Sequence, residues 1–359
     1  MNSRERVVTA LRHKPTDRVP FDFALGFSPY QLAQFKAHTG QEDPNDYFGA
    51  DVRGTSIGPT RLKTDYSRYI DPASLPAHAY IDEWGQGHIP TESNDQYHSH
   101  LEGYVYPMLG LHSAKDALDY PLPDIEAKYR YDQVALDIAR HHERGLAVMA
   151  GMACTIFEVA WYMRSMELLL MDFVDNQEFA EVLLDRITEK RIIQAQRYAA
   201  LAPDVIMFGD DVATQRGMLM SVGMWRKWLK GRLARVIAAA RQTNPDVIIF
   251  YHSDGDATAI VPDLIEIGVD VLNPIQPECM DLFALKRKYG DQISFWGTLG
   301  TQSTLPFGTP QDVAQDIQER CEIAADNGGL LIAPTHMVEP EVPWENILAF
   351  VESVKKFHR

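Results

Sequence analysis

From residue 146 onward, short apolar runs alternate with longer stretches in which apolar residues recur at the spacing of a helix. The short runs predict strands, because they are apolar, contain β-branched residues and end at polar residues. An apolar residue at every third or fourth position instead places one apolar face along a helix. We expect strands at 146–153, 204–209, 247–251, 269–275, 293–297 and 329–333, and helices at 166–200, 222–241, 259–267, 310–325 and 344–357.

The first 145 residues carry a weaker pattern. Asn2 or Ser3 can cap a first helix that ends before Pro15, and strands are expected at 21–25 and, with a weaker signal, at 79–84. Residues 86–135 are polar, contain several prolines and show no clear periodicity. Such a segment is typical of a long insertion that acts as a lid, here placed before the third strand. The whole chain, 1–359, is then expected to form a single domain.

Alternation of strand and helix indicates an α/β protein with a parallel sheet. The number of repeats fits a closed (β/α)8 TIM-type barrel better than an open, doubly wound sheet. An open dinucleotide-binding sheet would show GxGxxG after its first strand, and the sequence contains no such motif. In a barrel, the polar residues at the carboxyl ends of the strands meet at one mouth, where the active site lies.

Composition excludes several classes of protein. The net charge of −16 and the pI near 5.1 disfavour binding to nucleic acid or to anionic membranes. No run of 18 apolar residues occurs, and the first 25 residues lack the apolar segment of a signal peptide, so we expect a soluble cytoplasmic protein. Cys154, Cys279 and Cys321 are far apart and form no CxxC pair, which argues against a disulfide framework.

Two strand ends carry side chains that can bind a metal. In VIIFYHSDGD at 247–256, His252 and Asp254 project from the same face of the backbone, because the period of a strand is two. The run GGLLIAPTH at 328–336 ends in His336. If these ends converge, the three side chains form a site that can hold zinc, iron or manganese with an open position. The alternative is that His252 and Asp254 bond to each other or to nearby backbone and only terminate a strand.

Other strand ends supply carboxylates. Asp210 and Asp211 end the run DVIMFGDD, and one of them is expected to point into the mouth as a general base or a substrate-binding group. A helix-capping aspartate is the alternative. Glu158 lies among apolar residues and suits a general acid if it is buried, although an ion pair with Arg164 would explain it equally well. Further candidates for substrate contact are Glu83, Gln215, Gln276 and Phe27.

Several segments are similar to the uroporphyrinogen decarboxylase superfamily. They include ERVVTALRHKPTDRVPFDF at 5–23, FGDDVATQRGMLMS at 208–221, HSDGDATAIVPDLIEIGVDVLNPIQPE at 252–278 and WGTLGTQSTLPFGTP at 296–310. The resemblance implies a (β/α) barrel with its active site at the carboxyl mouth. It also implies one of two activities, which are porphyrin decarboxylation without a cofactor and zinc-dependent methyl transfer among corrinoid proteins, thiols and tetrahydrofolate.

The chain departs from both branches of this superfamily. The decarboxylases carry an arginine-rich RQAGR segment near the N-terminus, where this chain reads FALGFSPYQ. The methyltransferases carry HxC and a later cysteine as zinc ligands, and these positions match His252, Asp254 and His336. Zinc held by imidazole and carboxylate is a stronger Lewis acid than zinc held by thiolates, and it leaves a bound thiolate less nucleophilic. Oxygen-containing or quaternary-amine substrates are therefore favoured over thiols.

The sequence thus predicts a metal-dependent methyltransferase-like enzyme with a small-molecule substrate. In this hypothesis His252, Asp254 and His336 bind a divalent metal, with zinc as the expected ion, Asp211 and Glu158 handle protons, and Asp210 and Gln276 contact substrate. A corrinoid protein or tetrahydrofolate is the methyl partner by resemblance alone. One alternative is a metal-free lyase or decarboxylase that acts on a small carboxylate, with His336 and Asp211 as acid and base. Another is a subunit that only docks a corrinoid protein. The oligomeric state is left open, a homo-oligomer included.

Overall fold

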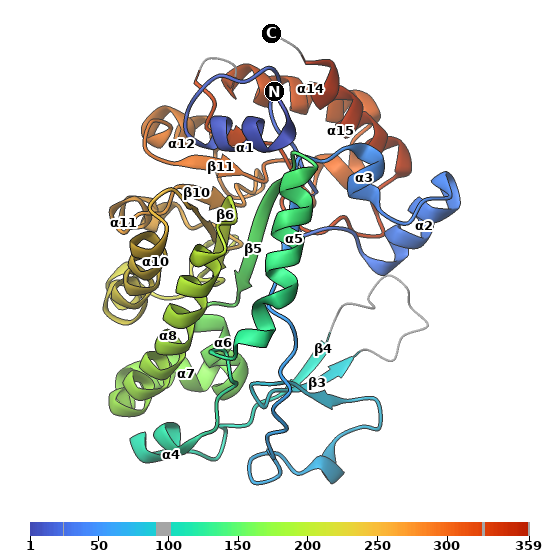
Figure 1. The fold of residues 1–359 in the computed structure, drawn as a ribbon. Coiled ribbons are helices and arrows are strands. Elements are labelled where there is room, and N and C mark those ends of the chain that lie inside the picture. The colour runs from blue at the N-terminus through green and yellow to red at the C-terminus, as the bar shows by residue number, and fades with distance from the viewer. Residues whose placement is uncertain (24, 91–101, 325–326, 358–359) are drawn as a thin grey trace.

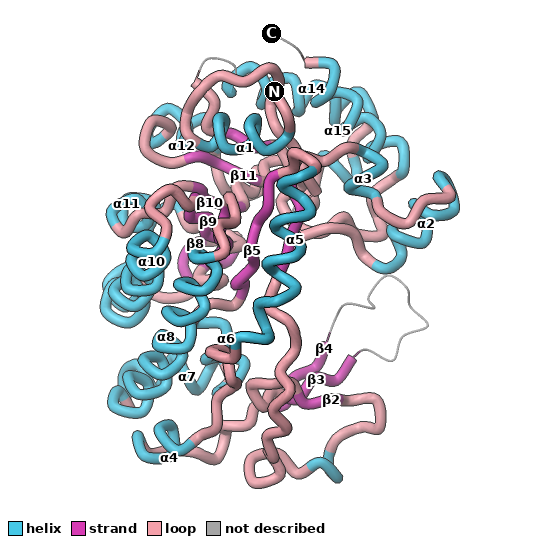
Figure 2. Tube along the Cα trace, in the orientation of Figure 1, coloured by secondary structure: helices cyan, strands magenta, loops and turns pink. Residues whose placement is uncertain are grey.

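A parallel sheet of seven strands forms the centre of the protein, in the order β1-β5-β6-β9-β10-β11-β12. The computed structural model describes residues 1–359 except 24, 91–101, 325–326 and 358–359. In Figure 2 the strands lie together in the middle of the molecule. Their bounds are β1 (Val52–Thr55), β5 (Ala147–Ala153), β6 (Val205–Gly209), β9 (Ile248–His252), β10 (Val271–Asn273), β11 (Ser294–Trp296) and β12 (Leu330–Leu331).

Helices follow the strands and pack along the outside of the sheet (Figure 1). The first begins after Asn2, whose side chain accepts a hydrogen bond from the N–H of Glu5. None of the helices in the described part of the chain combines the length and the apolar character needed to cross a membrane. The helices are α1 (Ser3–Leu11), α2 (Pro29–Thr39), α3 (Pro44–Phe48), α4 (Ala114–Asp119), α5 (Asp132–Glu143), α6 (Phe157–Arg164), α7 (Met166–Asp175), α8 (Gln177–Ala200), α9 (Val222–Trp225), α10 (Gly231–Thr243), α11 (Val261–Glu266), α12 (Leu282–Tyr289), α13 (Thr304–Phe307), α14 (Pro310–Ala324) and α15 (Trp344–Lys356).

A short segment around Phe21 connects the two edges of the sheet. Phe21 forms a parallel bridge with Ile332, just beyond β12. The N–H of Asp51, just before β1, donates to the carbonyl oxygen of Phe21 at 2.9 Å. The segment therefore lies where an eighth strand of a closed barrel would lie. The predicted α/β class and parallel sheet are confirmed, and these contacts are consistent with the predicted barrel, although the segment forms an isolated bridge rather than a regular strand.

The predicted barrel strand at 79–84 is wrong. Its residues form β2 (Tyr80–Ile81), which pairs antiparallel with β3 (Gly87–Pro90), and β3 pairs with β4 (Glu102–Val105). This small sheet lies at the end of the molecule opposite the two termini (Figure 1). The range 86–135 therefore contains regular structure in its described part, whereas residues 91–101 lie outside the described residues. Its role as a lid stays a prediction. A second small sheet joins β7 (Ala213–Thr214) and β8 (Gly217–Met218).

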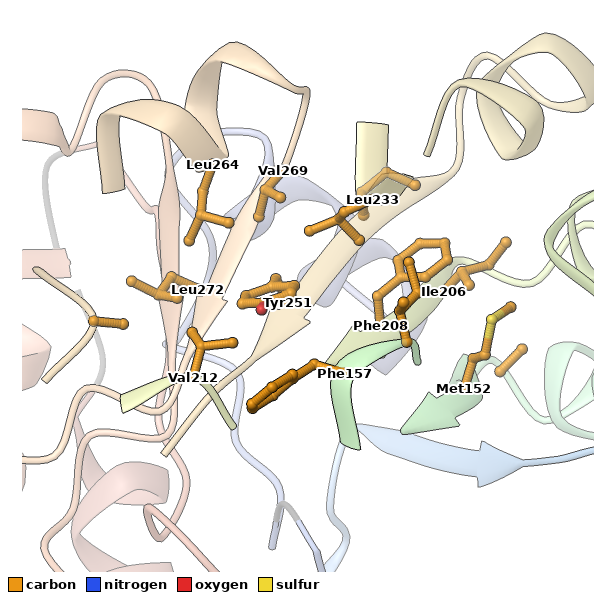
Figure 3. Close-up of a cluster of buried hydrophobic side chains, with 14 of the residues drawn as sticks. Met152, Phe157, Ile206, Phe208, Val212, Leu233, Tyr251, Leu264, Val269 and Leu272 are labelled. Carbon is orange, nitrogen blue, oxygen red and sulfur yellow. The ribbon is translucent and has the colours of Figure 1, made fainter. Parts of the chain in front are cut away.

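Apolar side chains pack on both faces of the parallel sheet, and their alternation orients the strand ends. Along β9, Ile248 and Phe250 belong to an inner cluster, whereas Ile249 and Tyr251 belong to the larger cluster beneath the helices. Figure 3 shows Tyr251 in this outer layer with Leu233 of α10 and Phe208 of β6. Because side chains alternate along a strand, His252 at the end of β9 points to the inner side.

Candidate metal centre at the carboxyl ends of the strands

His252 presents one ring nitrogen to a group of polar side chains, and Asn273 determines which one. The Nδ1 atom of His252 lies 2.7 Å from Oδ1 of Asn273, at the end of the neighbouring strand β10. The amide nitrogen of Asn273 donates to the carbonyl oxygen of Trp296 at 2.9 Å, so Oδ1 is the atom that faces His252. Because Oδ1 can only accept, Nδ1 of His252 carries the proton, and Nε2 has a free lone pair when the ring is neutral. The sequence shows Asn273 only as a polar residue at a strand end, so its contact with His252 could not be predicted from the sequence.

Two carboxylates and a second imidazole lie near this lone pair. Nε2 of His252 is 3.7 Å from Oδ1 of Asp211 and 3.9 Å from Oδ1 of Asp254. The other oxygen of Asp254 is 3.9 Å from Nε2 of His336. Within the described residues, Asp211, His252 and Asp254 offer ligand atoms that all lie within 4.8 Å of one another. The structure thus brings together the three predicted ligands, and it adds Asp211 to them.

Hydrogen bonds between successive strand ends hold the carboxylates in place. The N–H of Asp254 donates to Oδ1 of Asp211 at 2.8 Å, and the N–H of Asp211 donates to Oε2 of Glu158 at 3.1 Å. Gln276 accepts from the N–H of Gly255 at 2.8 Å and donates to Oδ1 of Asp254 at 3.4 Å. Gln276 therefore orients Asp254. Its expected contact with substrate stays a prediction.

Gly255 permits the close packing behind Asp254. Its φ is +82°, and a Cβ atom at this position would lie 2.6 Å from the carbonyl carbon of Thr214. Only glycine combines this left-handed conformation with such a close approach of backbone. The loop after β9 can therefore lie directly against β7.

Burial and mutual repulsion raise the proton affinity of the carboxyl groups. Burial, followed by the charges of Asp211 and Asp210, raises the pKa of Glu158 well above its ordinary range. Burial also raises the pKa of Asp254, an effect that the neighbouring His252 opposes and Asp211 reinforces. The predicted alternative partner of Glu158, Arg164, instead pairs with Asp172 at 2.8 Å. Several carboxyl groups thus lie close together in a partly buried site. A divalent cation bound there would stabilise their ionised forms.

Asp210 is oriented differently from its neighbour. Its carboxylate accepts hydrogen bonds from the N–H groups of Ile156 at 2.9 Å and of Glu158 at 3.0 Å, at the start of α6. Burial raises the pKa of Asp210 to about 6. With its oxygens occupied by backbone and 4% of the residue exposed, Asp210 fits the helix-capping alternative rather than the predicted contact with substrate.

Three further predicted substrate contacts lie among other partners. Glu83 receives two hydrogen bonds from Arg130, at 2.8 Å and 2.7 Å. Phe27 is buried, with its ring centroid 4.7 Å from that of Phe23. Gln215 is exposed and donates to Gln302. Glu83 thus forms a salt bridge, Phe27 a core contact and Gln215 a surface hydrogen bond. None of these contacts involves the His252 group, by which we mean Asp211, His252, Asp254 and His336.

The fold and the site define an α/β protein in which imidazoles and carboxylates gather at the strand ends of a parallel sheet. The sequence model described as Uroporphyrinogen decarboxylase (URO-D) matches residues 105–357. This chain belongs to the uroporphyrinogen decarboxylase family, which confirms the resemblance seen in the sequence.

Relatives of this chain are enzymes of two kinds. A methylcobamide:CoM methyltransferase MtaA from Methanosarcina barkeri is 27% identical over 185 residues, which are 52% of this chain and 51% of that protein. The chain thus matches about half the length of this relative. A uroporphyrinogen decarboxylase from Coxiella burnetii is 23% identical over 270 residues, 72% of each chain. A structure described as a methyltransferase from Methanosarcina mazei has the same fold, with a TM-score of 0.69, 20% identity and 99% of both chains covered.

Proposed function

We propose that this protein is a metal-dependent methyltransferase-like enzyme that moves a methyl group between a small substrate and a corrinoid protein or tetrahydrofolate. The observation that carries the proposal is the lone pair of His252 Nε2, oriented by Asn273 toward Asp254. Similarity to the MtaA methyltransferase supports methyl transfer as the reaction class. His252, Asp254 and His336 would hold the metal, with zinc as the expected ion.

The donor set fits a divalent metal. Two nitrogen or oxygen ligands about 2.0 to 2.1 Å from one tetrahedral ion are about 3.4 Å apart. Nε2 of His252 lies 3.9 Å from Oδ1 of Asp254, and Nε2 of His336 lies 3.9 Å from Oδ2, so each pair is about half an ångström wider than two ligands of one bound ion. The imidazole and carboxylate ligands suit zinc and also other transition metals. A metal bound there would act as a Lewis acid that polarises a substrate heteroatom.

In this proposal Asp211 and Glu158 would have different roles in proton transfer beside the metal. Asp211 keeps 35% of its side chain exposed, and its Oδ1 lies next to Nε2 of His252. Glu158 is buried behind it, and its raised pKa favours a carboxyl group that keeps its proton at higher pH than an ordinary glutamate does. Asp211 would therefore exchange a proton with the substrate, while Glu158 stays neutral and avoids adding a further charge.

The protein groups around the nearby Cys279 do not activate its thiol. Burial, with Asp256, Glu278 and Asp254 nearby, raises the pKa of Cys279 to about 11, so its thiol stays protonated at neutral pH. Its sulfur lies 3.7 Å from Oε1 of Gln276. A ligand set of imidazole and carboxylate favours oxygen-containing or quaternary-amine methyl compounds as substrates.

Metal analysis of the full chain, purified without an affinity tag or chelator, tests this proposal. We expect about one equivalent of zinc or another transition metal, and its loss in His252→Ala and Asp254→Asn with unchanged circular dichroism. Asp246→Asn is the matched control, because Asp246 keeps 89% of its side chain exposed. Wild-type protein that takes up no metal even after reconstitution would contradict the proposal.

A metal-free lyase is the second candidate, and the decarboxylase from Coxiella burnetii, matched over 72% of both chains, favours it. In that case His336 and Asp211 act as acid and base on a small carboxylate. The FALGFSPYQ stretch offers no arginine to a porphyrin, so the substrate would be smaller. Release of carbon dioxide from such a substrate in the presence of a chelator would separate this candidate from the methyltransferase.

A further inference from the structure

A cavity lies where the segment after β1 meets the end of β5. Its volume is about 750 Å³, and its lining includes Ile57, Trp84, Arg130, Met152 and Arg191. The lining contains no residue of the candidate metal centre. Arg130 and Arg191 come from different parts of the chain, and the apolar side chains form much of the remaining wall. The cavity is therefore distinct from the site described above and has its own chemistry.

Arg191 brings a buried positive charge to this cavity. The residue is 6% exposed, and its Nε and Nη2 atoms donate to the carbonyl oxygens of Thr155 and Cys154, both at 2.9 Å. Nη1 donates to Oε1 of Gln194 at 2.6 Å. Among the described residues, no carboxylate forms an ion pair with Arg191 within 4.0 Å. Asp210 and Glu83 act on this charge only from beyond that distance. Both terminal nitrogens of Arg191 keep a second N–H group, to which an acceptor oxygen of a ligand can bind.

Arg130 adds a second donor whose hydrogen-bonding capacity is not used. The residue is 2% exposed, and its Nη2 binds both oxygens of Glu83. Its Nη1 is buried and has no hydrogen-bond partner within the described residues, the carboxylate of Asp124 being 3.5 Å away. Because Glu83 and Asp124 both pair with Arg130, the lining offers a ligand unused N–H groups rather than an excess of positive charge.

We propose that this cavity binds a monocarboxylate with an apolar body, held by the guanidinium groups of Arg191 and Arg130. The carboxylates of Glu83 and Asp124 beside Arg130 disfavour a doubly charged phosphate, whereas the N–H groups of a guanidinium match the two oxygens of a singly charged carboxylate. The Trp84 ring centroid lies 5.0 Å from the guanidinium carbon of Arg191, which holds that group in place. Ile57 and Met152 provide apolar contacts for the body of the ligand. This inference does not rest on the proposed methyl transfer.

Calorimetric titration of the full-length protein with benzoate and benzamide tests the proposal. The two probes have nearly the same shape, and only benzoate is charged. We expect benzoate to bind at least about tenfold more tightly than benzamide, because a hydrogen bond to a charged group contributes more than one to a neutral group. Equal binding of the two probes, or no binding of benzoate, would overturn the proposal.

Two variants assign the binding to this cavity. Arg191→Lys keeps the charge and removes the fork of N–H groups, and Ile57→Trp fills part of the cavity while keeping the backbone N–H that donates to Tyr198 at 2.9 Å. We expect each to weaken benzoate binding by about tenfold or more. Ile57→Trp keeps the test valid if Arg191→Lys does not fold. His252→Ala and the exposed Arg235→Lys should leave binding within about twofold. Loss of benzoate binding in His252→Ala, with Ile57→Trp unaffected, would place the anion at the metal centre instead.

Discussion

Asn273 lies beside His252 because β9 and β10 pair in a register that aligns these two residues. The 2.7 Å contact between Asn273 Oδ1 and His252 Nδ1 fixes both the orientation of the imidazole and its tautomer. An outer partner of this kind keeps a metal-binding imidazole in its productive orientation. Asn273, which is not among the proposed ligands, thereby positions a side chain of the candidate site.

Replacement of Asn273 by alanine should weaken metal binding by about tenfold to a hundredfold, because His252 loses the partner that orients its ring. Competition with a chelator of known affinity measures this change. Asn176→Ala is the control, since Asn176 donates to the carbonyl oxygen of His112, away from the His252 group. Equal affinity in wild type and Asn273→Ala would show that the ring needs no such support.

Asp211 and His336 should respond differently to substitution. We expect His336→Ala to lose metal, because it removes a proposed ligand, and Asp211→Asn to keep about one equivalent while turnover falls by about a hundredfold or more. Metal analysis and methyl-transfer assays on the same preparations separate the two effects. The opposite result, with metal lost in Asp211→Asn and kept in His336→Ala, would define Asp211, His252 and Asp254 as the ligands.

Glu158 should make the metal-free protein less stable as the pH rises. The pKa of Glu158 is raised in the folded state. Between the ordinary glutamate pKa and this raised pKa, the folded protein therefore binds more protons than the unfolded chain. The free energy of unfolding falls with rising pH over this range. Glu158→Gln removes this loss and should raise the free energy of unfolding by about 1 kcal/mol or more at pH 8, with little change at pH 4.

Urea titrations of the metal-free protein at both pH values measure this difference. The exposed Glu167→Gln serves as control. A variant that is no more stable than wild type at pH 8 would mean that Glu158 is ionised at little cost.

Gly255→Ala should destabilise the protein by about 1 to 3 kcal/mol, because the added methyl group would meet the backbone of Thr214 in a left-handed conformation. Gly231→Ala is the control, since nothing lies within 4 Å of its added Cβ at the start of α10. That control should be neutral or slightly stabilising. Urea unfolding compares the two, and equal stabilities would show that the loop after β9 adjusts freely.

The sequence by itself determined the α/β class and the polar residues at the strand ends. Strand and helix periods depend on side chains only a few positions apart, so the strand predicted at 146–153 is observed at Ala147–Ala153. β1 has the sequence VRGT and contains no apolar run, so the sequence pattern did not predict it. Only its pairing with β5 in the structure identifies it as a strand. The strand predicted at 79–84 failed for a related reason, since local pattern does not say which sheet a segment joins.

Only the tertiary structure decided what each strand end faces. Asp210 caps α6 while the adjacent Asp211 lies beside His252, and Glu83 pairs with Arg130. These outcomes depend on the register between strands and on helices far away in the chain, which local periodicity does not encode. The His252–Asn273 pair has the same origin, because two residues separated by 21 positions meet only when their strands align.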